Sequence, residues 1–104
     1  MNEANAEAGE RPTILIADDT PANFGVVVDS LTERGFRVLV ALDGEEALER
    51  ALFSQPDLIL LDVKMPGIDG FETCRRLKAN ERTRDIAVIF MTSLTGGDDM
   101  VEGF

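Results

Sequence analysis

Four polar side chains of this sequence could act together on phosphorus or on a metal ion, because each follows an apolar run. They are Asp18 and Asp19 after residues 13–17, Asp62 after residues 58–61, and Thr92 after residues 86–91. Such runs are typical of strands buried on both faces of a parallel sheet. The carboxyl ends of parallel strands meet at one edge of the sheet, so we expect these side chains to converge.

The chemistry expected at that edge is metal-assisted phosphoryl transfer. Crowded carboxylates raise one another's pKa unless a cation lies between them, and an all-oxygen group with open positions suits Mg²⁺. Asp62 beside such a metal could attack phosphorus, because forming an acyl phosphate depends mainly on neutralising the incoming oxygens. Thr92 could donate its hydroxyl to a phosphoryl oxygen.

Each of these residues also has an ordinary structural explanation when it is taken alone. Asp62 fits a simple strand end, Asp18 and Asp19 fit a helix cap before Pro21, and Thr92 fits the usual polar end of a strand. The combination of all four residues favours a functional site.

Alternating strand and helix patterns position these residues. We expect strands at 13–17, 37–41, 58–61 and 86–91, and helices from Thr20 to Gly35, from Asp43 to Pro56, from 69 to 80, and after Gly97. Thr20 is expected to cap the first helix, with Phe24, Val27, Val28 and Leu31 on its inner face. Short alternating units of this kind predict a parallel α/β sheet with right-handed crossovers.

Composition limits the classes of partner. The 104 residues allow one domain, which we place at 12–104 after a disordered polar tail at 1–11. The net charge of -10 disfavours direct binding to nucleic acid or anionic membrane. The start of the chain lacks the basic pattern of a signal peptide, and no apolar run is long enough to span a bilayer, so we expect a cytoplasmic location.

Four segments together resemble the receiver domain of two-component response regulators. They are ILIADD at 14–19, GEEAL at 44–48, LILLDVKMPGIDG at 58–70 and VIFMTS at 88–93, in the order and approximate spacing of that family. The resemblance runs from about Thr13 to Phe104. It implies a flavodoxin-like, doubly wound parallel sheet with strand order 2-1-3-4.

The resemblance also implies a role for each site residue. Asp62 would accept a phosphoryl group from a sensor histidine kinase or a histidine phosphotransfer protein, in a reaction that requires Mg²⁺. Asp19 would bind the metal directly and Asp18 mainly through water, together with Asp62 and the backbone carbonyl of Lys64. Thr92 would be the switch hydroxyl. Such a domain is no turnover enzyme, since it catalyses only its own phosphorylation and slow dephosphorylation.

The sequence departs from the family at its end. Receivers carry a fifth strand and helix, and a lysine that pairs with the phosphoryl group, whereas this sequence stops first and neither Lys64 nor Lys78 takes that place. Met100 to Phe104 stop in mid-helix, which favours a fragment of a longer receiver over a truncated domain that completes itself by dimerisation. In either case we expect marginal stability, and self-association through the exposed edge of the fourth strand.

Three other functions remain open. A receiver-like scaffold that no longer uses phosphate agrees with the missing lysine. An aspartate-nucleophile phosphatase of the haloacid dehalogenase type would need an acid two residues after Asp62, where this sequence has Lys64. A nucleotide-binding module would need a glycine-rich loop after the first strand, where Asp18 and Asp19 would repel a pyrophosphate.

Overall fold

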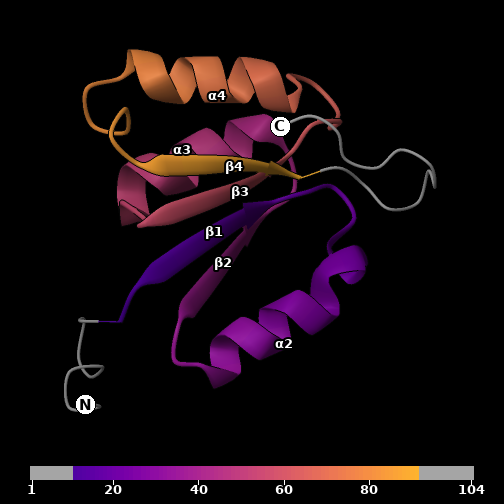
Figure 1. Ribbon diagram of the computed structural model, residues 1–104. Helices are drawn as coiled ribbons and strands as arrows, with labels where there is room; N and C mark the ends of the chain where they lie inside the picture. The colour runs from indigo at the N-terminus through magenta and orange to yellow at the C-terminus, as the bar shows by residue number, and fades with distance from the viewer. Residues whose placement is uncertain (1–10, 92–104) are drawn as a thin grey trace.

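Four parallel strands form the centre of the computed structural model, which describes residues 11–91 (Figure 1). They are β1 (Thr13–Ala17), β2 (Arg37–Ala41), β3 (Leu58–Asp62) and β4 (Ala87–Met91). Their order across the sheet is β2-β1-β3-β4, and every neighbouring pair is parallel. The predicted strands and the predicted order 2-1-3-4 are therefore confirmed.

Helices cover both faces of this sheet. They are the short 3₁₀ helix η1 (Pro21–Phe24), α2 (Gly25–Glu33), α3 (Gly44–Ser54) and α4 (Gly70–Ala79). Figure 1 shows α3 and α4 on one face of the sheet and α2 on the other. The fold is the doubly wound parallel α/β arrangement that the sequence predicts.

The main core lies between the sheet and the pair α3 and α4. Leu15 of β1 and Ile59 of β3 are completely buried there, and Leu77 of α4 is 1% exposed. Ala47 and Ala51 give α3 a small-residue face, which lets the helix pack close to the strands. This core holds the two central strands in place, and their carboxyl ends carry the predicted site.

Side-chain caps set the start of both core helices. Asp43 accepts a hydrogen bond from the backbone N–H of Glu46 at 2.8 Å, and Asp69 accepts one from Glu72 at 2.9 Å. Caps of this kind stabilise a helix by about 1 kcal/mol. The predicted starts of these helices at Asp43 and near Asp69 are confirmed.

The start of the first helix differs from the prediction. The side chain of Thr20 makes no capping hydrogen bond, and its hydroxyl donates to Oδ1 of Asp19 at 3.3 Å. The backbone N–H of Thr20 donates to Oδ1 of Asp18 at 2.6 Å, so the chain turns around Asp18 and enters a 3₁₀ turn. Pro21 occupies the first turn, as predicted.

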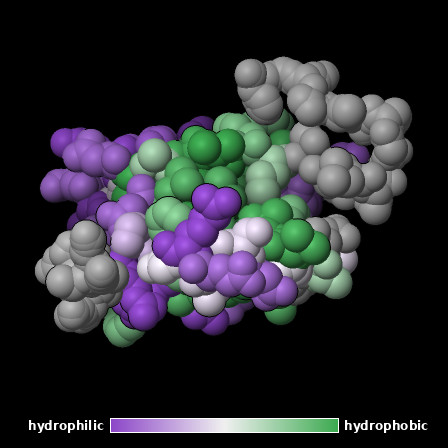
Figure 2. All heavy atoms as spheres, turned by 60° about the horizontal axis from the view of Figure 1, so that its bottom comes forward, coloured by the Kyte–Doolittle hydropathy of each residue, from purple (hydrophilic) through white to green (hydrophobic). Residues whose placement is uncertain are grey.

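The α2 side of the sheet is less closed than the α3 side. No residue of α2 is fully buried, and Val27 of the predicted inner face is 39% exposed. On β4, Ala87 is exposed and Ile89 is 53% exposed. Figure 2 brings this side of the molecule forward and shows apolar surface, in green, next to polar side chains.

Some predictions fall on residues outside the described range. These are the polar tail at 1–10, the switch hydroxyl of Thr92, and the helix expected after Gly97. Among residues 11–91, no helix is both long enough and apolar enough to cross a membrane.

Candidate functional site

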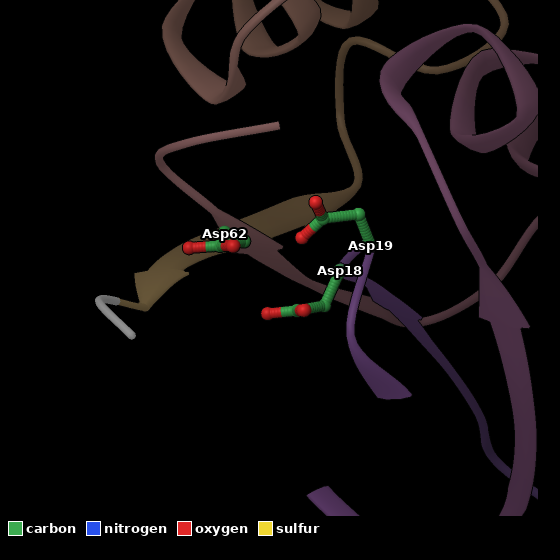
Figure 3. A group of neighbouring side chains, drawn as sticks. All are labelled: Asp18, Asp19 and Asp62. Carbon is green, nitrogen blue, oxygen red and sulfur yellow. The ribbon is translucent and has the colours of Figure 1, made fainter. Parts of the chain in front are cut away.

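The ends of β1 and β3 bring three carboxyl groups together, as the sequence predicts. Asp18 and Asp19 follow β1, and Asp62 is the last residue of β3. One oxygen from each side chain lies within 4.8 Å of the other two, and Figure 3 shows the three carboxyl groups gathered at this edge. The convergence of residues 44 positions apart follows from the pairing of parallel strands.

Backbone hydrogen bonds hold this edge on both sides. Ala17 of β1 is in register with Leu61 of β3, so the acids that follow them are neighbours. The N–H of Asp18 donates to the carbonyl of Ala41 at 2.9 Å, and the N–H of Val63 donates to the carbonyl of Met91 at 3.1 Å. All four strand ends therefore fix the backbone that carries the acids.

Asp18 is the most deeply buried of the three acids, with 1% of its surface exposed. Its Oδ1 accepts the hydrogen bond from Thr20, while its buried Oδ2 has no hydrogen-bond partner among the described residues. Leaving a buried carboxylate oxygen unpaired is costly. A cation next to Oδ2 would satisfy this oxygen, so the donor set fits a hard divalent metal.

Asp62 is 3% exposed, and its environment raises its pKa to about 7 from an ordinary value of 3.8. Loss of hydration is the largest cause, followed by the side chain of Asp18, to which only a protonated Asp62 could donate a hydrogen bond, and by the negative charge of Asp18, with a smaller contribution from Asp19. The nearby backbone N–H of Lys64 opposes the rise in pKa. The protonated form of Asp62 is thus far more populated at neutral pH than that of an ordinary aspartate when no cation is bound.

Asp19 is the exposed member of the group. Two buried acids and one exposed acid form a site that is open to solvent on one side. Mg²⁺ usually keeps several waters when it binds to protein carboxylates. The open side would leave room for those waters and for an incoming phosphoryl group.

The loop between β3 and α4 carries Lys64, whose side chain is exposed. Met65 anchors the loop because it is only 9% exposed and packs in the core, and Gly67 has a φ of +76° that favours glycine. The N–H of Lys64 is a site group that sequence reasoning missed, because backbone donors leave no mark in a sequence. Thr92 follows β4 directly but lies outside the described residues.

Comparisons with known proteins give the family context of this geometry. The sequence model of the response regulator receiver domain matches residues 14–104. Response regulator PleD of Caulobacter vibrioides is 46% identical over 90 residues, which cover 86% of this chain and 20% of PleD. The DNA-binding dual master transcriptional regulator RpaA of Synechocystis is 44% identical over 93 residues, which cover 89% of this chain and 39% of RpaA. The chain thus spans less than half of either relative.

Solved structures agree with the fold. The N-terminal domain of a response regulator receiver protein from Methanoculleus marisnigri superposes with a TM-score of 0.72 at 45% identity, covering 75% of this chain and 63% of that chain. The receiver domain of a sensor histidine kinase from Pseudomonas aeruginosa gives a TM-score of 0.73 at 31% identity, covering 85% and 73%. That second structure holds a magnesium ion coordinated in its active-site cleft.

Proposed function

We propose that this chain, which belongs to the response regulator receiver domain family, accepts a phosphoryl group on Asp62 and thereby switches an output. The observation that carries the proposal is the carboxyl cluster, in which oxygens of Asp18, Asp19 and Asp62 lie within 4.8 Å of one another at the carboxyl edge of the sheet. The chain is a signalling domain of the receiver type. Any reaction beyond its own phosphorylation and slow dephosphorylation would belong to other domains or proteins.

Asp18, Asp19, Asp62 and the backbone carbonyl of Lys64 would hold Mg²⁺. The unpartnered Oδ2 of Asp18 supports this assignment, as does the magnesium ion in the receiver domain from Pseudomonas. When bound, the cation supplies positive charge that offsets the charge on the incoming phosphoryl oxygens. It also favours the ionised form of Asp62, whose pKa is otherwise raised.

In the proposed reaction, a carboxylate oxygen of Asp62 attacks the phosphorus of a phosphohistidine on a sensor kinase or phosphotransfer protein. A phosphorus–oxygen bond forms as the phosphorus–nitrogen bond breaks, and the imidazole leaves with the electron pair. Thr92 would donate its hydroxyl to the new phosphoryl group. Its place in the sequence supports this role, because Met91 is in register with Asp62 across β3 and β4.

The test is the intact mass of the protein before and after incubation with Mg²⁺ and acetyl phosphate. We expect the gain of one phosphoryl group, and no gain in Asp62→Asn, whose side chain has nearly the same size. Asp85→Asn is the matched control, since Asp85 is exposed in the loop before β4. It should gain the phosphoryl group like the wild type.

Three results would contradict this proposal. A phosphoryl group that remains on Asp62→Asn would place the acceptor elsewhere. No gain in the folded wild type would favour the receiver-like scaffold. Release of many phosphates per chain from a phosphomonoester would favour the phosphatase, although the acid that this reaction needs two residues after Asp62 is Lys64.

We also propose that two copies associate through β4. Among the described strands β4 pairs only with β3, and Ile89 in its centre is 53% exposed. An apolar edge strand favours pairing with another chain. In sedimentation experiments the apparent mass of the wild type should rise with protein concentration, and Ile89→Lys should keep the mass of a monomer. A wild type that stays monomeric at all concentrations would contradict the proposed association.

A further inference from the structure

Gly70, the first residue of α4, lies directly against the backbone of the phosphoacceptor. A Cβ atom at this position would clash with the carbonyl oxygen of Asp62, and it would lie 2.9 Å from Cα of Val63 and 3.0 Å from the carbonyl carbon of Asp62. These are backbone atoms of the last residue of β3 and of the residue that follows it, and they cannot rotate away as a side chain can. Only glycine fits here without moving either the end of β3 or the start of α4.

The same glycine closes the loop that carries Lys64. Its N–H donates to the carbonyl of Val63 at 2.8 Å, so the two ends of the loop at 63 and 70 are tied together. Asp69, the cap of α4, is the last residue before the tie. The backbone N–H of Lys64, inside this closed loop, lies near enough to the carboxyl group of Asp62 to lower its pKa.

We propose that Gly70 is a positioning residue for the metal and phosphoacceptor site. Its close approach lets α4 dock on the carbonyl of Asp62 and thereby sets where the backbone of Lys64 meets the carboxyl group. Any side chain at position 70 would push the loop away from Asp62. This inference rests on the proposed function, because the affected groups are those that would bind Mg²⁺.

The chain contains a matched position for comparison. Gly44 is the first residue of α3, follows the capping residue Asp43, and is buried like Gly70. A Cβ atom on Gly44 would clash with Oγ1 of Thr73 and would lie 2.6 Å from Cγ1 of Ile68. Ile68 belongs to the loop and Thr73 to α4, but the crowded atoms are in their side chains rather than in the backbone, and none of them belongs to Asp62 or Lys64.

The experiment compares Gly70→Ala with Gly44→Ala. Both variants should unfold at lower urea concentration than the wild type, since both are crowded. Mg²⁺ binding measured by calorimetry should weaken about 10-fold or more in Gly70→Ala, as is typical when groups that orient metal ligands are disturbed. In Gly44→Ala the affinity should stay within about twofold of the wild type.

Equal Mg²⁺ affinity in Gly70→Ala and the wild type would overturn the proposal, as would an equal loss in both variants. If Gly70→Ala does not fold, hydrogen exchange of the wild type gives the answer. Mg²⁺ should slow exchange of the Gly70 amide, whose hydrogen bond closes the loop, more than that of the Ala47 amide in the first turn of α3. No such difference would overturn the inference.

These results separate this inference from the proposed function. A wild-type protein that binds Mg²⁺ and gains a phosphoryl group, together with an unaffected Gly70→Ala, would refute the role of Gly70 alone. A folded wild type that gains no phosphoryl group would refute the proposed function.

Discussion

The interior of β1 and β3 and the carboxyl ends of the same strands are equally buried but chemically opposite. Leu15 and Ile59 are completely buried among apolar side chains. Asp18 and Asp62 are 1% and 3% exposed, yet they face each other as carboxyl groups, and one oxygen of Asp18 has no partner among the described residues. Burial stabilises the fold in the first region and opposes it in the second.

This difference separates stability from function within single strands. A residue kept in spite of a folding cost is a good candidate for a functional role, because most sequence changes at such a site would relieve the cost. Substitutions in the two regions should therefore change the free energy of unfolding in opposite directions.

The largest effect is expected in the interior. Ile59→Ala removes buried methyl and methylene groups from β3 and should lower the free energy of unfolding by about 2–5 kcal/mol. Urea unfolding without metal measures this. Ile59→Val, which should cost about 0.5–1.5 kcal/mol, keeps the test possible if the alanine variant does not fold.

Either Ile59 variant, when folded, should still gain one phosphoryl group on Asp62, since the side chain of Ile59 lies in the core between the sheet and the helices. A folded Ile59→Val that cannot be phosphorylated would show that packing in the interior also controls the reaction at the carboxyl edge. The two regions could then not be treated as independent.

Asp62→Asn should have the next largest effect, and it should raise the free energy of unfolding rather than lower it. Because the pKa of Asp62 is raised to about 7, the folded protein holds a proton that the unfolded chain releases from about pH 4. The contribution of Asp62 to stability is therefore most favourable below about pH 4 and falls as the pH rises to about 7. Asp62→Asn avoids this loss and should be more stable than the metal-free wild type by roughly 1–3 kcal/mol at pH 8.

Urea unfolding at pH 5 and pH 8 without metal checks this. The excess stability of Asp62→Asn over the wild type should be larger at pH 8 than at pH 5. Mg²⁺ should stabilise the wild type at pH 8 and thereby reduce this difference in the free energy of unfolding. An advantage of the same size at both pH values would show that charge is not the cause.

How much of this site the sequence predicts depends on the kind of interaction. The apolar runs before Asp18 and Asp62 predict the strands, and parallel pairing then brings the acids together, as the structure confirms. The position of the Lys64 N–H near Asp62 and the close approach of Gly70 depend on where the loop docks, which residue types do not encode. The Thr20 cap was wrong because the hydroxyl of Thr20 donates to Oδ1 of Asp19 and accepts no hydrogen bond from the first turn of the helix.

The unequal burial of Asp18 and Asp19 shows a similar limit. Residue type and position after β1 do not distinguish the burial of the two acids, whereas in the structure Asp18 is buried and Asp19 is exposed. Whether Asp19 binds Mg²⁺ directly and Asp18 through water stays a prediction. Because one oxygen of Asp18 has no hydrogen-bond partner among the described residues, direct binding of a cation by Asp18 should be tested as well.

The smallest effect on stability is expected for Asp19→Asn. Solvent screens the charge of an exposed carboxylate, so removing it should change the free energy of unfolding by less than about 0.5 kcal/mol without metal. Mg²⁺ affinity, measured by calorimetry, should nevertheless fall at least about 10-fold, because a proposed ligand is lost. Asp19→Asn would then separate metal binding from folding cost more cleanly than Asp62→Asn, which changes both. If Asp19→Asn instead stabilised the metal-free protein as much as Asp62→Asn does, repulsion among the three acids, rather than burial, would be the main cost at this edge.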